Sequence, residues 1–293
     1  HASPGLAGCA PEVLMGPVAL ATHRIRLGSG GIMLPHYSPF KVAETFKLLA
    51  ALAPDRIDLG LGRAPGTDGR TSYALQRDRS RRMPVDDFPQ NLAEVLAYLG
   101  NGLPEDHPFA SLKDTLPTGG GTVEPWLLGS SIESAAWAAE VGLPYCIADF
   151  INSDGLPQAE LYKRHFRPSR WLEKPYLMVA SWAIAAPSRA EAERLAVPAR
   201  MMFHHLVRGE LIPVPSVEKA ENWAASVVDA PQRNRRSILG SPSEVKAQVD
   251  EVAAFYGADE MMLVNIMPDH EARKRSYRLI AAEYGLASPA QAA

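Results

Sequence analysis

Three segments rich in glycine and serine lie within or directly after runs of β-branched and aliphatic residues, and they hold the residue types best suited to contact a ligand. They are Gly28-Ser29-Gly30-Gly31, Gly60-Leu61-Gly62-Arg63 and Gly129-Ser130-Ser131. Glycines inside a strand weaken it unless a bulge, an unusual peptide or a flat ligand requires them. The first segment is therefore predicted to be either a plain bulge or the contact surface of a flat ligand.

The other two segments carry groups that bind phosphate. Arg63 stands where the chain leaves a strand, and it is either a surface ion-pair partner or a charged ligand contact. Ser131 is a predicted helix N-cap, and Ser134 follows three residues later. A junction of this kind offers backbone N–H groups, hydroxyls and the positive end of a helix dipole to an anion, although capping alone would also explain the serines. Because the carboxyl ends of parallel strands build the sites of α/β proteins, we expect the three segments to lie together.

Other kinds of site find little support in the spacing of residues. The eight histidines show no HxH or HExxH pattern, so no metal site is predicted. No GxSxG segment marks a serine hydrolase, and Pro65 breaks the GxGxxG pattern of a dinucleotide site. A phosphosugar-type barrel lyase would need a lysine at a strand end, and the predicted strands have none.

Composition excludes several classes of partner. The chain has 30 Lys and Arg against 33 Asp and Glu, a net charge of −3, which argues against a broad nucleic-acid-binding face. The longest apolar stretch, Tyr176–Ala186, is too short to span a membrane. The first residues lack the features of an export signal, so a cytoplasmic protein is expected. Cys9 and Cys146 are both predicted to be small buried side chains, without a disulfide.

Short buried strands alternate with longer amphipathic helices, which is the pattern of βα units. The predicted strands are Ile25–Leu34, Arg56–Leu61, Trp126–Leu128, Tyr145–Ala148, Leu177–Ala185 and Glu260–Ile266. Helices are predicted after Ser38-Pro39 and over Asp86–Leu99, Ser131–Val141, Ser188–Val207, Pro242–Tyr256 and His270–Tyr284.

Two long connections separate these elements. The first, from Arg63 to Trp126, is predicted to hold a single helix, and the second, Leu211–Asn234, is predicted to be irregular. Long loops in compact α/β proteins often form lids. We therefore predict one domain over residues 1–293, with insert loops at about 64–124 and 211–236. Substrate selection is expected from Thr67–Asp86 and Leu211–Asn234.

The segments RIRLGSGGIMLP (24–35), RIDLGLGRAPGTD (56–68), WLLGSS (126–131) and AAEVGLP (138–144) together resemble the bacterial luciferase-like flavin monooxygenases. The resemblance continues through Phe166–Ser169, Gly257–Glu260 and Asp269–Arg273, so it covers almost the whole chain. It implies a (β/α)8 TIM-type barrel that binds reduced FMN at the carboxyl ends of its strands. The predicted strands correspond to the family's third to eighth, so the first two are absent from this sequence, and we expect the chain to be a piece of a longer protein.

The resemblance also implies roles for individual residues. Ser29, Gly30 and Gly31 would lie against the isoalloxazine ring, often through a non-proline cis peptide in this family. Arg63 and the segment Gly129, Ser130, Ser131 and Ser134 would hold the FMN phosphate. His1 resembles the last residue of the family's Glu-His-His motif and would be the catalytic histidine.

The function implied is a monooxygenase that takes reduced FMN from a separate reductase and uses dioxygen to oxidise a small organic substrate. A deazaflavin- or flavin-dependent reductase or dehydrogenase of the same superfamily and a non-catalytic flavin-binding protein are the alternatives. A homodimer is expected through helices early in the fold. The apolar stripe of Phe40, Phe46 and Leu49, too rich for packing within one chain, is offered as its interface.

Overall fold

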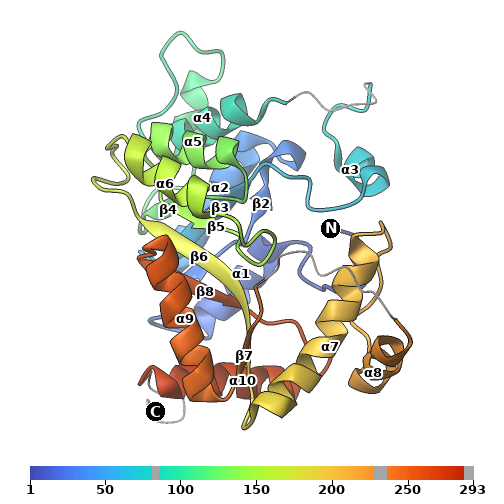
Figure 1. The fold of residues 1–293 in the computed structure, drawn as a ribbon. Coiled ribbons are helices and arrows are strands. Elements are labelled where there is room, and N and C mark those ends of the chain that lie inside the picture. Colours follow the sequence, from blue (N-terminus) through green and yellow to red (C-terminus); the bar gives the residue numbers. More distant parts are fainter. Residues whose placement is uncertain (81–85, 228–235, 287–293) are drawn as a thin grey trace. The chain divides into compact units, whose positions relative to one another are not determined.

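The computed structural model describes residues 1–80, 86–227 and 236–286. Contacts group the chain into two compact units, the first made mainly of residues 8–145 and 161–175 and the second mainly of 146–160 and 176–293 (Figure 1). Strand β5 (Tyr145–Ile147) and helix α6 (Leu156–His165) contribute residues to both. The prediction of a single domain stays a prediction.

The first unit contains the strands that position the candidate site. They are β1 (Leu27–Gly28), β2 (Ile32–Met33), β3 (Ile57–Gly62) and β4 (Val123–Gly129). β1 pairs in parallel with the start of β3 and β2 with its end, while β4 lies along the other side of β3. The predicted strand Ile25–Leu34 is thus two short strands, because Ser29–Gly31 leave the ladder between them.

Helices cover this sheet and account for the apolar stripe. They are α1 (Pro11–Leu20), α2 (Pro39–Leu52), α3 (Gly69–Leu75), α4 (Phe88–Leu99) and α5 (Ile132–Val141), with the 3-10 turns η1 (Leu34–His36) and η2 (Ala110–Thr115). Phe46 and Leu49 of α2 are buried within the unit, and Phe40 packs edge-on against Tyr98 of α4. The prediction that this stripe exceeds the needs of one chain is therefore wrong.

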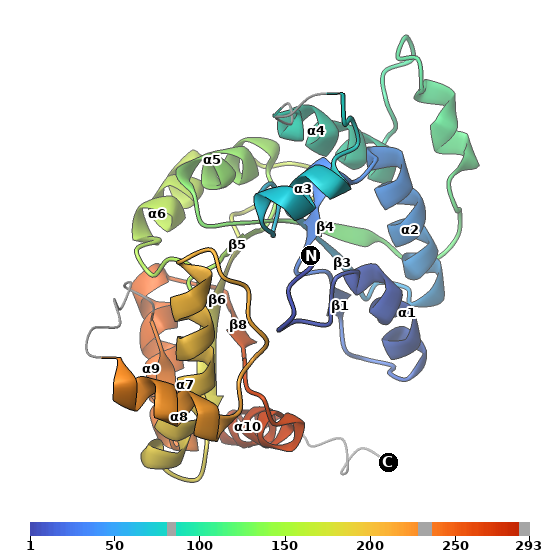
Figure 2. The same ribbon diagram turned by 90° about the vertical axis from the view of Figure 1, so that its right-hand side faces the viewer.

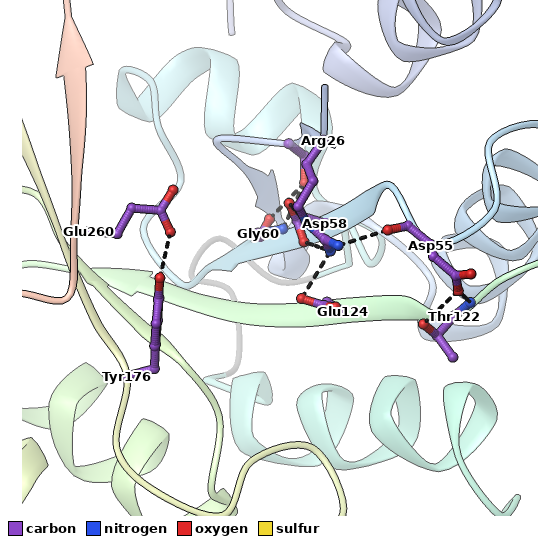
Figure 3. Close-up of polar contacts among 9 residues, drawn as sticks. Arg26, Asp55, Asp58, Gly60, Thr122, Glu124, Tyr176 and Glu260 are labelled. Atoms are coloured by element: carbon purple, nitrogen blue, oxygen red, sulfur yellow. Dashed lines mark hydrogen bonds and ion pairs between the residues drawn. The ribbon is translucent and has the colours of Figure 1, made fainter. Parts of the chain in front are cut away.

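A charged network joins the amino ends of the strands in the first unit (Figure 3). Arg26 donates hydrogen bonds to both carboxylate oxygens of Asp58, at 2.5 and 3.2 Å, and to the carbonyl of Asp55 at 2.7 Å. It also forms an ion pair with Glu124 at 2.9 Å. The β3–β4 register sets Asp58 opposite Glu124, so Arg26 bridges two carboxylates that would otherwise repel each other.

The second unit is built on β6 (Leu177–Ala185), which pairs in parallel with β7 (Ile238–Gly240) and β8 (Glu260–Val264). Its helices are α7 (Arg189–Leu206), α8 (Val217–Ser226), α9 (Pro242–Tyr256) and α10 (His270–Glu283). Trp182 and Ile184 share a buried cluster with Leu195 of α7, whereas the alternate residues of β6 face the other way. At the end of β6, the backbone N–H of Ala185 donates a hydrogen bond to the Ser276 hydroxyl on α10.

Those alternate positions also carry a buried polar cluster. Asp149 is fully buried and accepts hydrogen bonds from Ser181 at 2.8 Å and Tyr256 at 2.9 Å, and it pairs with Arg236 at 3.3 Å. Burial and, after it, the Asp149 carboxylate raise the pKa of Tyr256 to about 12. The tyrosine therefore stays a hydrogen-bond donor at any ordinary pH.

Several predicted features need correction. The connection from Arg63 to Trp126 holds α3 and η2 besides α4, and the stretch predicted to be irregular forms α8 over Val217–Ser226. Residues 81–85 and 228–235 of the two predicted insert loops lie outside the described part of the chain. Helices α1 and α6 and strand β7 were not predicted. No helix in the described part is both long and apolar enough to cross a bilayer.

The two cysteines differ in environment. Cys9 is exposed, so its predicted burial is wrong, because the chain around it stays outside the packed helices. Cys146 is buried, as predicted, and burial raises the pKa of its thiol to about 12. Its thiolate is therefore rare at neutral pH, which fits an inert packing role.

Candidate functional site

The Ser29–Gly31 segment is held to β3 by the side chain of Ser29. The buried Ser29 hydroxyl donates to the carbonyl of Gly60 at 3.1 Å and accepts from the N–H of Gly60 at 3.0 Å. The peptide between Gly30 and Gly31 is cis. Ser29 thus fixes the backbone of this segment, and its hydroxyl is engaged within the protein.

The glycines here bring backbone against backbone. A Cβ at Gly60 would lie 2.1 Å from the carbonyl oxygen of Ser29, and a Cβ at Gly31 would lie 2.7 Å from that of Gly60. At Gly30, by contrast, a Cβ would meet no atom of the described residues within 4 Å. The segment therefore offers a bare backbone surface next to open space, which suits a flat ring.

Arg63 directly follows β3, beside the end of β4, since Gly62 pairs with Leu128. Its guanidinium forms an ion pair with Asp86 at 2.6 Å, and its central carbon lies 5.3 Å from the ring centroid of Trp137 on α5. The side chain remains 44% exposed. The arginine is thus both an ion-pair partner and a positioned cation, so the two interpretations open at the level of sequence are compatible.

The amino end of α5 lies next to Arg63. Ser131 is the N-cap, and its hydroxyl accepts from the N–H of Ser134 at 3.3 Å. Glu133, in the first turn, has its pKa lowered by a hydrogen bond from its own backbone N–H, then by the Ser131 hydroxyl, and also by the charge of Arg63. The charge of Arg63 therefore acts on a carboxylate at the same helix end that was expected to bind a phosphate.

The Ser134 hydroxyl was expected to bind the phosphate, but it is already engaged within the protein. Its side chain is buried, and its hydroxyl donates to the carbonyl of Ser131 at 2.8 Å and lies 2.9 Å from the hydroxyl of Tyr145. A Cβ at Gly129 would come within 2.2 Å of the same hydroxyl oxygen, so the glycine leaves room for it. Among the serines here, Ser130 and Ser131 are better placed to receive a ligand, since both are only partly buried.

His1 lies beside the loop that follows β3. Its carbonyl accepts a hydrogen bond from Thr67 at 2.7 Å, and its ring meets the ring of His36 edge-on, 5.6 Å away. Nε2 of His36 is 3.0 Å from the carbonyl of Pro65. Because a carbonyl only accepts, Nε2 of His36 is the donor in this hydrogen bond.

All of these groups belong to the first unit. The Ser29–Gly31 segment lies against Gly60 within β3, while His1, Arg63 and the amino end of α5 lie past the carboxyl ends of β3 and β4. Sequence reasoning missed four of their neighbours: His36, Asp86, Glu133 and Trp137. The spacing of Glu133 and Trp137, four residues apart on a helix, could have placed them on one face. In the ranges 1–80, 86–227 and 236–286, no group of three or more His, Cys, Asp or Glu is arranged to hold a metal ion.

Comparison with known proteins shows the family. A family model described as luciferase-like monooxygenase matches residues 1–260. A luciferase-like monooxygenase of Escherichia coli (strain K12) is 40% identical, covering 95% of this chain and 82% of that protein. The N-acetyl-S-alkylcysteine monooxygenase of Bacillus subtilis (strain 168) is 34% identical, covering 96% and 84%. The chain therefore belongs to the luciferase-like monooxygenase family, and it is an oxidoreductase.

Solved structures agree on the fold. The structure of apo-MsnO8 has a TM-score of 0.85 at 35% identity and covers 98% of this chain and 85% of that chain. The oxygenating constituent of 3,6-diketocamphane monooxygenase from Pseudomonas putida, in complex with FMN, has a TM-score of 0.66 at 20% identity, covering 95% and 84%. A coenzyme F420-dependent tetrahydromethanopterin reductase from Methanopyrus kandleri has a TM-score of 0.60 at 16% identity and covers 94% of this chain and 86% of that chain. The predicted α/β barrel class of the luciferase-like kind is confirmed.

Proposed function

We propose that the chain is a monooxygenase that uses reduced FMN and dioxygen to oxidise a small organic substrate. The observation that carries this proposal is the combination of a bare glycine backbone against β3 with a positioned arginine and a helix N-terminus past the carboxyl ends of β3 and β4. The first suits a flat ring, and the other two suit a phosphate. FMN carries both groups, and a protein of the same fold holds FMN.

Each residue has a part in this proposal. Gly30 and Gly31 receive the ring, while Arg63 and the segment Gly129–Ser131 hold the phosphate. Reduced FMN held there would supply the two electrons that activate dioxygen, of which one oxygen atom enters the substrate and the other leaves as water. The His1 imidazole is the proton-transfer group, and His36, its proton held on Nε2, packs against it.

A deazaflavin is the alternative cofactor, and the F420-dependent enzyme of the same fold favours including it. A titration distinguishes the two cofactors. The FMN proposal requires that FMN binds at micromolar concentration, and a protein that binds only a deazaflavin would overturn it. Turnover needs its own assay, in which the protein is incubated with FMN, a flavin reductase, NADH and oxygen. Substrate-dependent product would support catalysis over simple flavin binding.

Arg63→Ala tests the phosphate contact. The substitution removes a charged hydrogen bond, worth roughly 1.5–3 kcal/mol when well formed. Because Arg63 is partly exposed and already paired with Asp86, we expect the low end of that range, about a tenfold loss of FMN affinity. Riboflavin, which lacks the phosphate, should bind the wild type poorly and be indifferent to the change.

Ser134→Ala is the companion variant. Its hydroxyl is engaged with Ser131 and Tyr145, so we expect lower stability and little loss of FMN affinity. Flavin fluorescence titrations measure both variants. Equal losses for FMN and riboflavin in Arg63→Ala would mean that Arg63 acts on the fold or the ring, and the phosphate assignment would be abandoned.

Partners are also proposed. A separate flavin reductase supplies the reduced FMN in the cytoplasm, because the sequence lacks a dinucleotide-binding pattern. A homodimer is proposed through α1 and α2, which lie side by side (Figure 2). Their exposed apolar side chains are Val13, Leu14, Val18 and Leu20 of α1 and Leu48 and Leu52 of α2. A surface this apolar is typical of an interface.

A further inference from the structure

The cation of the proposed phosphate site already faces two carboxylates of the protein. Asp86 lies 2.6 Å from Nη2 of Arg63. Glu133 is in the first turn of α5, four residues before the Trp137 ring that the Arg63 guanidinium faces, and the charge of Arg63 contributes to lowering its pKa. Asp86 is on the long connection between β3 and β4, so the two carboxylates come from different elements. Asp86 occupies a donor of Arg63 that an anionic ligand would use, and Glu133 stands at the helix end that would receive the same ligand.

We propose that Asp86 and Glu133 compete with the cofactor phosphate for Arg63 and the amino end of α5, so that binding of the phosphate is an exchange of one anion for another. The inference rests on the proposed function, because it needs the phosphate to bind at Arg63. The competition means that two side chains of the protein lower its affinity for FMN. The two carboxylates then determine how strongly the site distinguishes FMN from a flavin without a phosphate.

The chemistry of the groups supports an exchange. Carboxylate and phosphate oxygens use the same donors: a guanidinium, a serine hydroxyl and the free N–H groups of a helix N-terminus. Glu133 stands in the first turn of α5, and its own backbone N–H and the Ser131 hydroxyl at this helix end lower its pKa. Ionised carboxylates also repel a phosphate that binds beside them. Either the carboxylates turn away when the phosphate binds, or the repulsion lowers the affinity for the phosphate.

The exchange is expected to be easy. Arg63 and Asp86 have side chains 44% and 53% exposed, and ion pairs in such surroundings are weak. A phosphate dianion therefore displaces Asp86 readily, while the stack of the guanidinium on Trp137 keeps the cation in place. The expected size of the competition is roughly two- to fivefold in affinity for each carboxylate.

The experiment compares Asp86→Asn and Glu133→Gln with two matched controls. Asp87→Asn removes the same charge one residue away, from a carboxylate that pairs with Arg77 instead. Glu140→Gln removes a charge near the other end of α5. Dissociation constants for FMN and riboflavin are measured by fluorescence titration of the full chain at one ionic strength, with thermal unfolding to verify the fold.

We expect the two test variants to bind FMN two- to fivefold more tightly, with riboflavin affinity unchanged and both controls like the wild type. In an Arg63→Ala background, Asp86→Asn should raise FMN affinity less than it does in the wild type, because only the direct repulsion is then removed. If FMN affinity does not rise in either test variant while Arg63→Ala still weakens FMN selectively, the competition is refuted and the phosphate assignment stands. An equal rise in Asp87→Asn would also refute it, since net charge alone would then explain the effect. Loss of FMN and riboflavin alike in Arg63→Ala would instead remove the assignment on which the inference depends.

Discussion

At the scale of single residues, two glycines of the candidate site, Gly30 and Gly60, have different surroundings. Gly60 is required by the fold, because a Cβ there would lie 2.1 Å from a backbone oxygen. At Gly30 the described residues leave room for a side chain, since a Cβ there would have no atom of theirs within 4 Å. The difference separates a structural glycine from one that leaves space for a ligand.

This contrast makes a prediction for alanine substitutions. Gly60→Ala should lower the free energy of unfolding by roughly 1–3 kcal/mol, because the backbone has to move apart. Gly30→Ala should leave unfolding nearly unchanged but weaken FMN and riboflavin equally, because the methyl group enters the space proposed for the ring. Urea denaturation and flavin titration measure the two effects. Wild-type flavin affinity in Gly30→Ala would place the ring elsewhere.

At the scale of elements, the strands of the first unit are joined at their amino ends by Arg26. The residue lies just before β1 and contacts Asp58 of β3 and Glu124 of β4 (Figure 3). Arg26→Ala leaves the two carboxylates opposed across the sheet without a cation. We expect the free energy of unfolding to fall by about 1–2 kcal/mol, discounted because the arginine is partly exposed.

Two further variants give this prediction its controls. Arg24→Ala removes an exposed arginine two residues away and should change stability little. Adding Glu124→Gln to Arg26→Ala should restore part of the loss, because one of the repelling charges is gone. Urea unfolding curves of the three variants decide the matter. The bridging role would be rejected if Glu124→Gln made the Arg26→Ala protein less stable still.

At the scale of the whole molecule, the proposed homodimer is testable by mass. α1 presents side chains that are 43–71% exposed and apolar at Val13, Leu14, Val18 and Leu20. Light scattering at micromolar concentration should give the mass of two chains. Leu14→Glu with Leu48→Glu should give one chain, because two charges would be buried at the interface.

Phe109→Glu serves as the control for that experiment. Phe109 is 52% exposed in another part of the first unit, just before η2, so its replacement should leave the dimer intact. A wild-type protein that scatters as a single chain would end the proposal. Dissociation by Phe109→Glu as well would show that the effect does not depend on the α1–α2 surface.

Local signals in the sequence determined the elements that depend on neighbouring residues. β6 and α9 have the predicted bounds, and α5 begins after its N-cap Ser131 and ends at Gly142, which is left-handed with φ of 67°. Caps, glycines and hydrophobic periods act within a few residues, so they are visible in a single chain. The neighbouring positions of Arg63 and the Gly129–Ser131 segment were also predictable, because adjacent parallel strands end at the same edge of a sheet.

Only the tertiary structure decided which groups meet across long separations. The burial of Phe46, the exposure of Cys9, the engagement of Ser134 with Tyr145 and the pairing of Arg63 with Asp86 each depend on which residues pack together. No local spacing encodes these contacts, because the energy of a side chain depends on neighbours brought by folding from elsewhere in the chain. The sequence alone therefore predicted where a cofactor site would be built, and the fold determined which side chains of that candidate site are already engaged within the protein.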